Sequence, residues 1–406
     1  MQLVSKNKRS NFLLIMLLII LVTSLTNPII FSFSDGLSLR LSSFIFLLAL
    51  FLSVLKNVNN SAVLSNAALS KLIPLFFITL ILSLYFTFDD YNYRKFSGLI
   101  AYFYFFVFVF IMSGEKISLE KAQFFFGSAL VIVIASMYII ELATIAKLRS
   151  SPLQSALFYV FPFQLLYYNF FSKKQLLDKG VLVFSILATV YALSFDFQKS
   201  AFIYIFSTLC LIFWITSKKI KLSRKILWLT LICILVSFGY DFVWQSFSNE
   251  IFDRDYSVIN SSRDVDALDS SLYRFYVYQY AFDSVTSDIF HFLFGYGPGY
   301  FATVHDGKTP HSSLLYLLMS FGIFGFLSYY LLIFLSLRRL LKGLSLDNYS
   351  RLSGFLIVFI LSGSIYSLFN NINGLSWEEF SFTTNILYFI AILIPFNLYE
   401  VKNDRR

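Results

Sequence analysis

Apolar runs of about 20 residues recur from one end of the chain to the other, and each is long enough to cross a bilayer as a helix. Hydrophobic residues make up 58% of the 406 residues and charged residues only 14%, compared with about 25% charged residues in soluble domains. A water-soluble fold cannot bury this much apolar surface. The sequence therefore predicts an all-α, polytopic membrane protein.

Twelve runs qualify as membrane-spanning helices, and we take residues 1–406 as a single integral membrane domain. The first run resembles a secretory signal peptide, but it continues through Pro28 without a small-residue cleavage motif, so we expect an uncleaved first helix. The predicted spans are 12–33, 38–55, 72–88, 97–113, 122–146, 153–171, 180–195, 199–217, 226–243, 311–336, 352–370 and 382–399.

The distribution of Lys and Arg between the spans predicts the orientation. With the N-terminus in the cytoplasm, the cytoplasmic segments hold 22 of the 32 Lys and Arg residues, including the SKKIKLSRK and LRRLLKG clusters. Short loops rich in these residues favour the cytoplasmic side. We therefore expect both termini in the cytoplasm and the chain in the cytoplasmic (inner) membrane.

Residues 244–310 form one large external (periplasmic) loop of 67 residues. A loop this long within a compact protein is usually functional. All three histidines, His291, His305 and His311, lie in it or at its end. Four basic residues oppose nine carboxylates, which are Glu250, Asp253, Asp255, Asp264, Asp266, Asp269, Asp283, Asp288 and Asp306.

The last histidine begins the apolar stretch HSSLLYLLMSFGIFG. On a regular helix, Gly322 and Gly325 lie within about 40° of His311 around the axis, so all three share one face. Small residues let another helix approach closely. This face should therefore point into the bundle and place His311 inside it, at the external membrane surface.

Thr309 and Pro310 are typical of an N-cap and a first helical residue. A helix that begins there directs free N–H groups and a positive dipole at His311, which favours a neutral imidazole and also attracts phosphate. The alternative is that His311 only anchors a helix end at the interface.

Four further charges lie at the external ends of the predicted spans: Arg40, Glu141, Asp196 and Lys199. Charges are costly in lipid and often mark functional sites. Together with His311 they predict a polar cavity that opens to the outer leaflet. The alternative for Arg40 and Lys199 is that each side chain reaches the lipid headgroups.

The loop segment SSLYRFYVYQYAF (270–282) is aromatic and is a candidate amphipathic helix lying on the membrane surface. Arg274 is the only basic residue between Asp264 and Lys308, and Tyr278 would lie beside it one helical turn later. A guanidinium suits bidentate phosphate binding. The alternative is an ion pair with the nearby aspartates.

Three motifs are weaker. GYGPG (295–299) resembles a phosphate-binding loop, but it lacks the GK[ST] ending and is better explained as a turn. DVD (264–266) resembles the metal-binding motif of nucleotide-sugar enzymes, yet a solvated acidic loop explains it better. The spacings of the three histidines match no helical pair of zinc ligands, so we expect no metal site.

His311-Ser312, nine intervening residues and Gly322-Ile-Phe-Gly325 resemble the H-[NSQ]-x9-G-x-x-G pattern of the O-antigen ligase and O-antigen polymerase superfamily. The upstream SLYRFYVYQYAF and FLFGYGPGYF are similar to the arginine-bearing aromatic helix and GxGxG segment of that family's loop. The order of these segments and the helix count agree too. The resemblance covers roughly residues 185–335.

This resemblance implies an inverting, metal-independent glycosyltransferase with a membrane-embedded fold of the C type (GT-C-like) and no cofactor. Arg274 would bind the donor pyrophosphate, and His311 would act as a base for the acceptor hydroxyl or contact the leaving phosphate. Family members often carry a further arginine before the eighth helix, where this chain has Lys199, which keeps the charge but loses the bidentate fork. Arg40 is a further candidate pyrophosphate-binding cation.

The sequence therefore predicts an O-antigen or capsular polysaccharide polymerase. Its donor and acceptor would be undecaprenyl-pyrophosphate-linked oligosaccharides on the external leaflet. Membrane lipid, a chain-length regulator protein and a flippase are candidate partners, and nucleic acid is not. The first alternative is an O-antigen ligase that transfers the chain to lipid A–core. The second is a flippase, although that class is expected to show two related halves, midplane charges and short loops.

Overall fold

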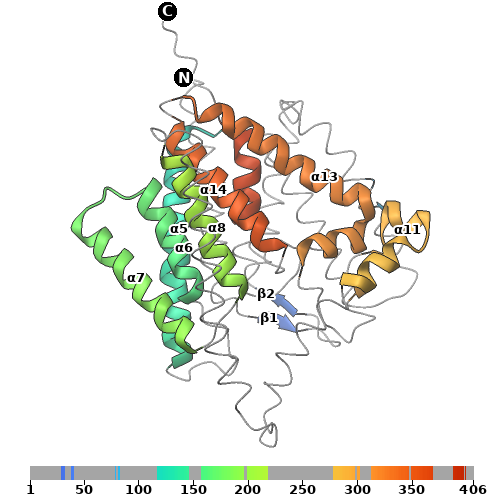
Figure 1. Cartoon of the computed structure of the whole chain (residues 1–406), viewed down its shortest axis with the longest axis horizontal. Coiled ribbons are helices and arrows are strands. Elements are labelled where there is room, and N and C mark those ends of the chain that lie inside the picture. The colour runs from blue at the N-terminus through green and yellow to red at the C-terminus, as the bar shows by residue number, and fades with distance from the viewer. Residues whose placement is uncertain are drawn as a thin grey trace, which may run out of the picture.

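The computed structural model describes residues 29–32, 38–40, 78, 81–82, 117–145, 157–195, 199–217, 278–297, 300–301, 312–346, 349–368, 387–396 and 398. Most of these residues are helical (Figure 1). The spans predicted over 97–113 and 226–243, and nearly all of the span over 72–88, lie outside the described residues.

Six long helices occupy spans that the hydropathy predicts. They are α5 (Leu119–Ile145), α6 (Leu157–Phe170), α7 (Leu176–Phe195), α8 (Lys199–Thr216), α13 (Ser313–Gly343) and α14 (Ser350–Ser367). The ends of these helices lie within a few residues of the predicted ends. The exception is the C-terminal end of α13, which lies further along the chain. The last predicted span contains a further apolar helix, Leu387–Phe396, which ends in η3 (Ile394–Phe396).

Among the described helices, three are long and apolar enough to cross a membrane: Leu119–Ile139 within α5, and the whole of α13 and α14. Ile203–Thr216 and Leu387–Phe396 are equally apolar in character but shorter. These helices and the composition agree with a membrane protein. The number of twelve spans and their orientation stay predictions.

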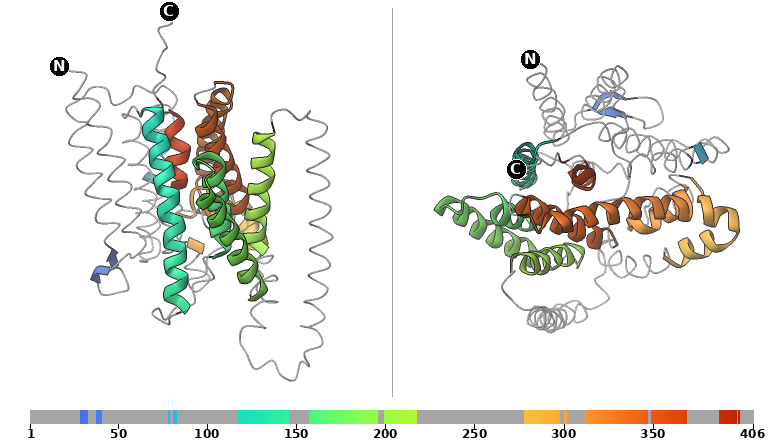
Figure 2. Two further views of the ribbon diagram at one scale, coloured as in Figure 1. Left: turned by 90° about the vertical axis from the view of Figure 1, so that its left-hand side faces the viewer. Right: turned by 90° about the horizontal axis from the view of Figure 1, so that it is seen from above.

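The helices α5, α6, α8 and α14 pack in one bundle, with α6 against both α5 and α8, and α14 against α8 (Figure 2). The helix α7 lies at the edge of the bundle against α6 (Figure 1). Its outward side chains are apolar, as expected of a helix that faces lipid; they include Leu176, Val183, Phe184, Leu187 and Val190. The helix α13 leads from α14 to the short helix α11 (Ile289–Phe294).

Aromatic rings fill the centre of this bundle. Phe355 of α14 is completely buried, and its ring centroid lies 4.9 Å from that of Phe171 and 5.2 Å from that of Phe126. Phe359, one turn later, stacks on Phe355 with centroids 5.6 Å apart. Lipid chains are as apolar as these side chains, so close packing rather than exclusion of water holds such helices together.

The prediction of helix over 12–33 and 38–55 is wrong at two short segments. The strand β1 (Ile29–Ser32) pairs antiparallel with β2 (Ser38–Arg40), and Ile29 lies opposite Arg40. Pro28 lacks the N–H that a helix needs, and two β-branched residues follow it. The described residues are therefore mostly helical, with one short two-stranded sheet among them.

The prediction of one regular helix over 311–336 is wrong at Gly322. This residue has φ 60° and ψ −166°, so α13 consists of two helical segments joined at a kink. A positive φ is readily adopted only by glycine, and glycine is one of the usual causes of a sharp helix kink.

We expect Phe355→Ala to lower the free energy of unfolding by about 3–5 kcal/mol, because it removes a fully buried ring and leaves a cavity. Thermal unfolding of the purified protein in detergent measures this change. The control is Phe334→Ala in α13, whose side chain is 61% exposed. Equal losses in the two variants would contradict the packing described for the bundle.

Candidate active site

Of the four residues predicted to contact substrate, two lie within the described residues. Lys199 is the first residue of α8, as predicted, and Arg40 is the last residue of β2 rather than part of a helix. His311 directly precedes the described Ser312, and Arg274 precedes the described Tyr278 by four positions, so both lie outside the described residues. The convergence of the four side chains stays a prediction.

The helix that follows His311 begins later than predicted. Its N-cap is Ser312, with extended backbone (φ −149°, ψ 118°), and the Ser312 side chain accepts a hydrogen bond from the Leu315 N–H at 3.5 Å. The prediction of Thr309 as the N-cap of this helix is therefore wrong. Serine at this position competes well for the cap because its hydroxyl satisfies a free N–H of the first turn. His311 is consequently the residue immediately before the cap.

Part of the predicted external loop packs on the first segment of α13. Residues 278–286 are helical. Ala281 and Val285 lie on one face of this helix and are buried together with Phe301 of the loop and with Met319, which belongs to α13. Phe282 on the other face is 63% exposed. The amphipathic helix expected in this region is thus present from Tyr278 onward. Its buried face packs against protein; its position on the membrane surface stays a prediction.

A backbone-to-backbone contact fixes the loop at the kink of α13. A Cβ atom on Gly295 would lie 2.6 Å from the backbone nitrogen of Gly322, and a Cβ atom on Gly322 would lie 2.5 Å from the Leu293 carbonyl oxygen. No side chain fits at either position, since real Cβ contacts are longer. Both glycines also have positive φ, 76° at Gly295 and 60° at Gly322.

Two hydrogen bonds reinforce this contact. The Tyr296 N–H donates to the Met319 carbonyl at 2.7 Å, and the Gly297 N–H donates to the Ser320 carbonyl at 3.0 Å. These carbonyls lie just before the kink, where helical hydrogen bonding is interrupted. We call the contact of Gly295 with Gly322, together with these two hydrogen bonds, the glycine clamp.

The glycine clamp accounts for two sequence motifs. The amides of Tyr296 and Gly297 are engaged by helix carbonyls, which supports the interpretation of GYGPG as a turn. Close approach of another helix at Gly322 is as expected, and the approaching segment is the end of α11, at Leu293 and Phe294. A Cβ atom on Gly325 would instead meet Phe321 of its own helix. The shared face calculated for His311 and both glycines does not continue across the kink.

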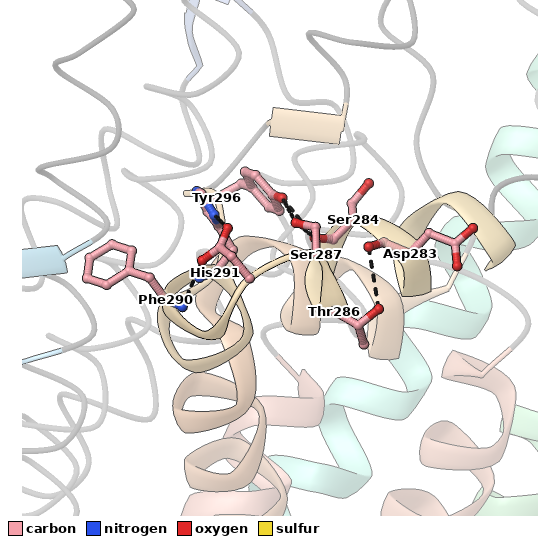
Figure 3. A network of polar contacts seen from close by, with 8 residues as sticks. Asp283, Ser284, Thr286, Ser287, Phe290, His291 and Tyr296 are labelled. Carbon is pink, nitrogen blue, oxygen red and sulfur yellow. Dashed lines mark hydrogen bonds and ion pairs between the residues drawn. The ribbon is translucent and has the colours of Figure 1, made fainter.

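A polar network lies beside the glycine clamp (Figure 3). The Asp288 carboxylate caps α11 by accepting hydrogen bonds from the N–H groups of Phe290 at 2.8 Å and His291 at 3.0 Å, and it also contacts Nδ1 of His291. The hydrogen bonds from the His291 side chain and backbone lower the pKa of Asp288. The carboxylate is therefore ionised at neutral pH and fixes the orientation of the imidazole.

Tyr296 connects this network to its surroundings. Its hydroxyl donates to the Ser284 carbonyl at 2.8 Å and lies 3.1 Å from the Ser287 hydroxyl (Figure 3). Its ring stacks on His291 with centroids 3.8 Å apart and on Tyr300 with centroids 4.3 Å apart. Burial and a hydrogen bond with Tyr280 raise the pKa of Tyr300, so the Tyr300 hydroxyl is protonated at neutral pH.

Sequence reasoning missed these roles for Asp288, His291 and Tyr296. Asp288 was noted only as a loop carboxylate and His291 only as one of three histidines, although aspartate is one of the preferred N-cap residues of a helix. The sequence carries no comparable signal for Tyr296, because its partners Ser284 and Met319 are brought to it by the fold.

Residues 181–330 match the model of the family described as O-antigen ligase. This part of the chain is therefore similar to that family, and the match supports the O-antigen polymerase and ligase superfamily. The match confirms the resemblance predicted over roughly 185–335. It spans α7, α8, the loop, and α13 beyond the kink, so both halves of the glycine clamp lie within it. No curated protein matches the chain.

We expect Asp288→Ala to speed hydrogen exchange of the Phe290 and His291 amides about fivefold, because it removes the cap that both amides use. Asp288→Asn should have a smaller effect, since asparagine caps helices about as well. Exchange monitored by mass spectrometry on a peptide covering α11 measures both. Asp283→Ala, an exposed carboxylate outside the cap, is the control, and unchanged exchange in Asp288→Ala would contradict the cap.

Proposed function

We propose that the protein is an O-antigen or capsular polysaccharide polymerase. It would move a growing chain from its undecaprenyl pyrophosphate to the non-reducing end of a new lipid-linked repeat unit, on the external leaflet of the cytoplasmic membrane. The observation that carries this proposal is the family match, because it covers the loop and the helix that the glycine clamp joins.

The chemistry fits a site built from the chain's own cations. A sugar pyrophosphate is already activated, so the reaction needs stabilisation of the leaving pyrophosphate and a base near the acceptor hydroxyl. Arg274 would supply a bidentate contact to the pyrophosphate, with Lys199 and Arg40 as further charges. With these cations, the reaction would need no metal ion to stabilise the pyrophosphate. The fold would be GT-C-like, and the site would lie on the periplasmic side.

His311 would be the base. In the sequence it precedes Ser312, the N-cap of α13, and we expect it to lie near the free N–H groups of the first helical turn. The positive end of the helix dipole disfavours an imidazolium there and leaves a neutral ring that accepts the proton of the attacking hydroxyl. The same helix end would attract the departing phosphate.

A ligase is the second candidate, because the matching family is described as O-antigen ligase. It would use the same donor and the same residues, but its acceptor would be lipid A–core. The two candidates differ in the acceptor, so one set of assays separates them.

The purified protein supplied only with the pyrophosphate-linked repeat unit should produce a ladder of chain lengths on a gel. Arg274→Ala and His311→Ala should each lower the rate at least a hundredfold, the scale expected for a lost base or charge stabiliser. Arg263→Ala and His305→Ala, which change the same residue types elsewhere in the loop, are the controls. Transfer only after addition of lipid A–core would make the protein the ligase.

In cells, His311→Ala should abolish product while the protein level stays at that of the wild type. Lipid-linked repeat units should then accumulate on the outer face of the membrane, because their transport precedes the missing step. Labelling with a membrane-impermeant sugar-specific reagent detects them. Accumulation on the inner face would instead indicate a transporter.

A further inference from the structure

Arg274, the proposed pyrophosphate-binding residue, and His311, the proposed base, come from different parts of the chain. Arg274 lies before the helix of residues 278–286, and His311 lies before α13, 37 residues later. Side chains near the start of the first helix pack beside the first segment of α13: Tyr278 and Tyr280 lie against the small core that Ala281 and Met319 share. The hydroxyl of Tyr278 also donates to the Leu368 carbonyl at the end of α14, at 3.4 Å.

The glycine clamp sets the position of one helix relative to the other. It joins backbone to backbone, so no side-chain rotamer separates Gly295 from Gly322, and the contact has little freedom to slide. Tyr296 adds a second constraint, since its N–H binds α13 while its hydroxyl binds the Ser284 carbonyl in the helix of 278–286. One residue therefore connects both helices (Figure 3).

We propose that Gly295, Gly322 and Tyr296 are positioning residues, which hold the donor-binding segment that carries Arg274 in register with the segment that carries His311. This inference rests on the proposed function. Transfer requires the acceptor oxygen, the anomeric carbon and the leaving pyrophosphate in line, and misplacement by about 1 Å can lower a rate a hundredfold. The glycine clamp is not a binding site itself; it acts through the two groups.

The sharpest test compares Gly322→Ala with Gly180→Ala. An added Cβ at Gly322 meets the backbone of Leu293 and Phe294, whereas an added Cβ at Gly180 in α7 has open space around it. For the first transfer step with the pyrophosphate-linked repeat unit, we expect Gly322→Ala to lower kcat at least tenfold and to change the donor KM less than threefold. A loss of rate with unchanged donor KM is expected when alignment, and not donor binding, is lost.

Tyr296→Phe keeps the test decisive if Gly322→Ala does not fold. It removes the hydroxyl that binds the Ser284 carbonyl and keeps the ring that stacks on His291 and Tyr300. We expect kcat to fall about threefold to tenfold with donor KM unchanged and thermal stability close to the wild type. Ser287→Ala, which removes a hydroxyl beside the same group, is the matched control and should have a smaller effect.

A double-mutant cycle with Arg274→Lys separates positioning from general damage. If the Tyr296 hydroxyl acts through Arg274, the combined variant Tyr296→Phe/Arg274→Lys should be no slower than Arg274→Lys alone within a factor of two. Independent effects would multiply instead. Multiplying effects, or a kcat of Gly322→Ala equal to that of Gly180→Ala, would overturn the inference while product formation by the wild type upholds the proposed function. A wild type inactive with every acceptor would overturn the proposed function itself.

Discussion

The contact between the backbones of Gly295 and Gly322 organises the described part of the predicted external loop. It requires glycine on both sides, because a Cβ atom at either position would overlap the other segment. It occurs where α13 kinks, so the carbonyls of Met319 and Ser320 accept from the loop. The described residues 278–297 of this loop thereby gain a fixed place on an apolar helix. The Asp288 cap, the Tyr296 network and the small core around Met319 all lie around this contact.

Hydropathy predicted the helices well because the length of an apolar run is set by the thickness of a bilayer and needs no knowledge of the fold. The strands β1 and β2 were missed because their apolar residues were counted into the neighbouring runs, although Pro28 interrupts the helical pattern. The kink was missed for a different reason. Glycine is tolerated in regular membrane helices, and only the partner segment at Leu293 shows why Gly322 leaves the helical conformation.

The candidate site was predictable as far as its motif is local. Ser312 follows His311 in the motif, and the structure gives that serine a physical role as the cap of α13. The family match covers the same stretch. Contacts between distant residues were not predictable: Tyr296 with Ser284 and Met319, and Gly295 with Gly322, depend on how the loop folds back. The helix α13, which carries this contact, packs against α14 of the bundle.

The central claim is that the loop stays docked on the kinked helix while the protein works, and cross-linking tests it most directly. The rings of Phe294 and Phe324 lie 5.6 Å apart, one on each side of the contact. In a background with Cys210→Ala and Cys233→Ala, the pair Phe294→Cys and Phe324→Cys should cross-link in native membranes. The cross-linked protein should form product at the rate of the uncross-linked pair. The control pair is Phe294→Cys with Phe334→Cys, because Phe334 is exposed and lies further along α13. Cross-linking no better than in this control, or activity that is lost on cross-linking and returns on reduction, would contradict the account.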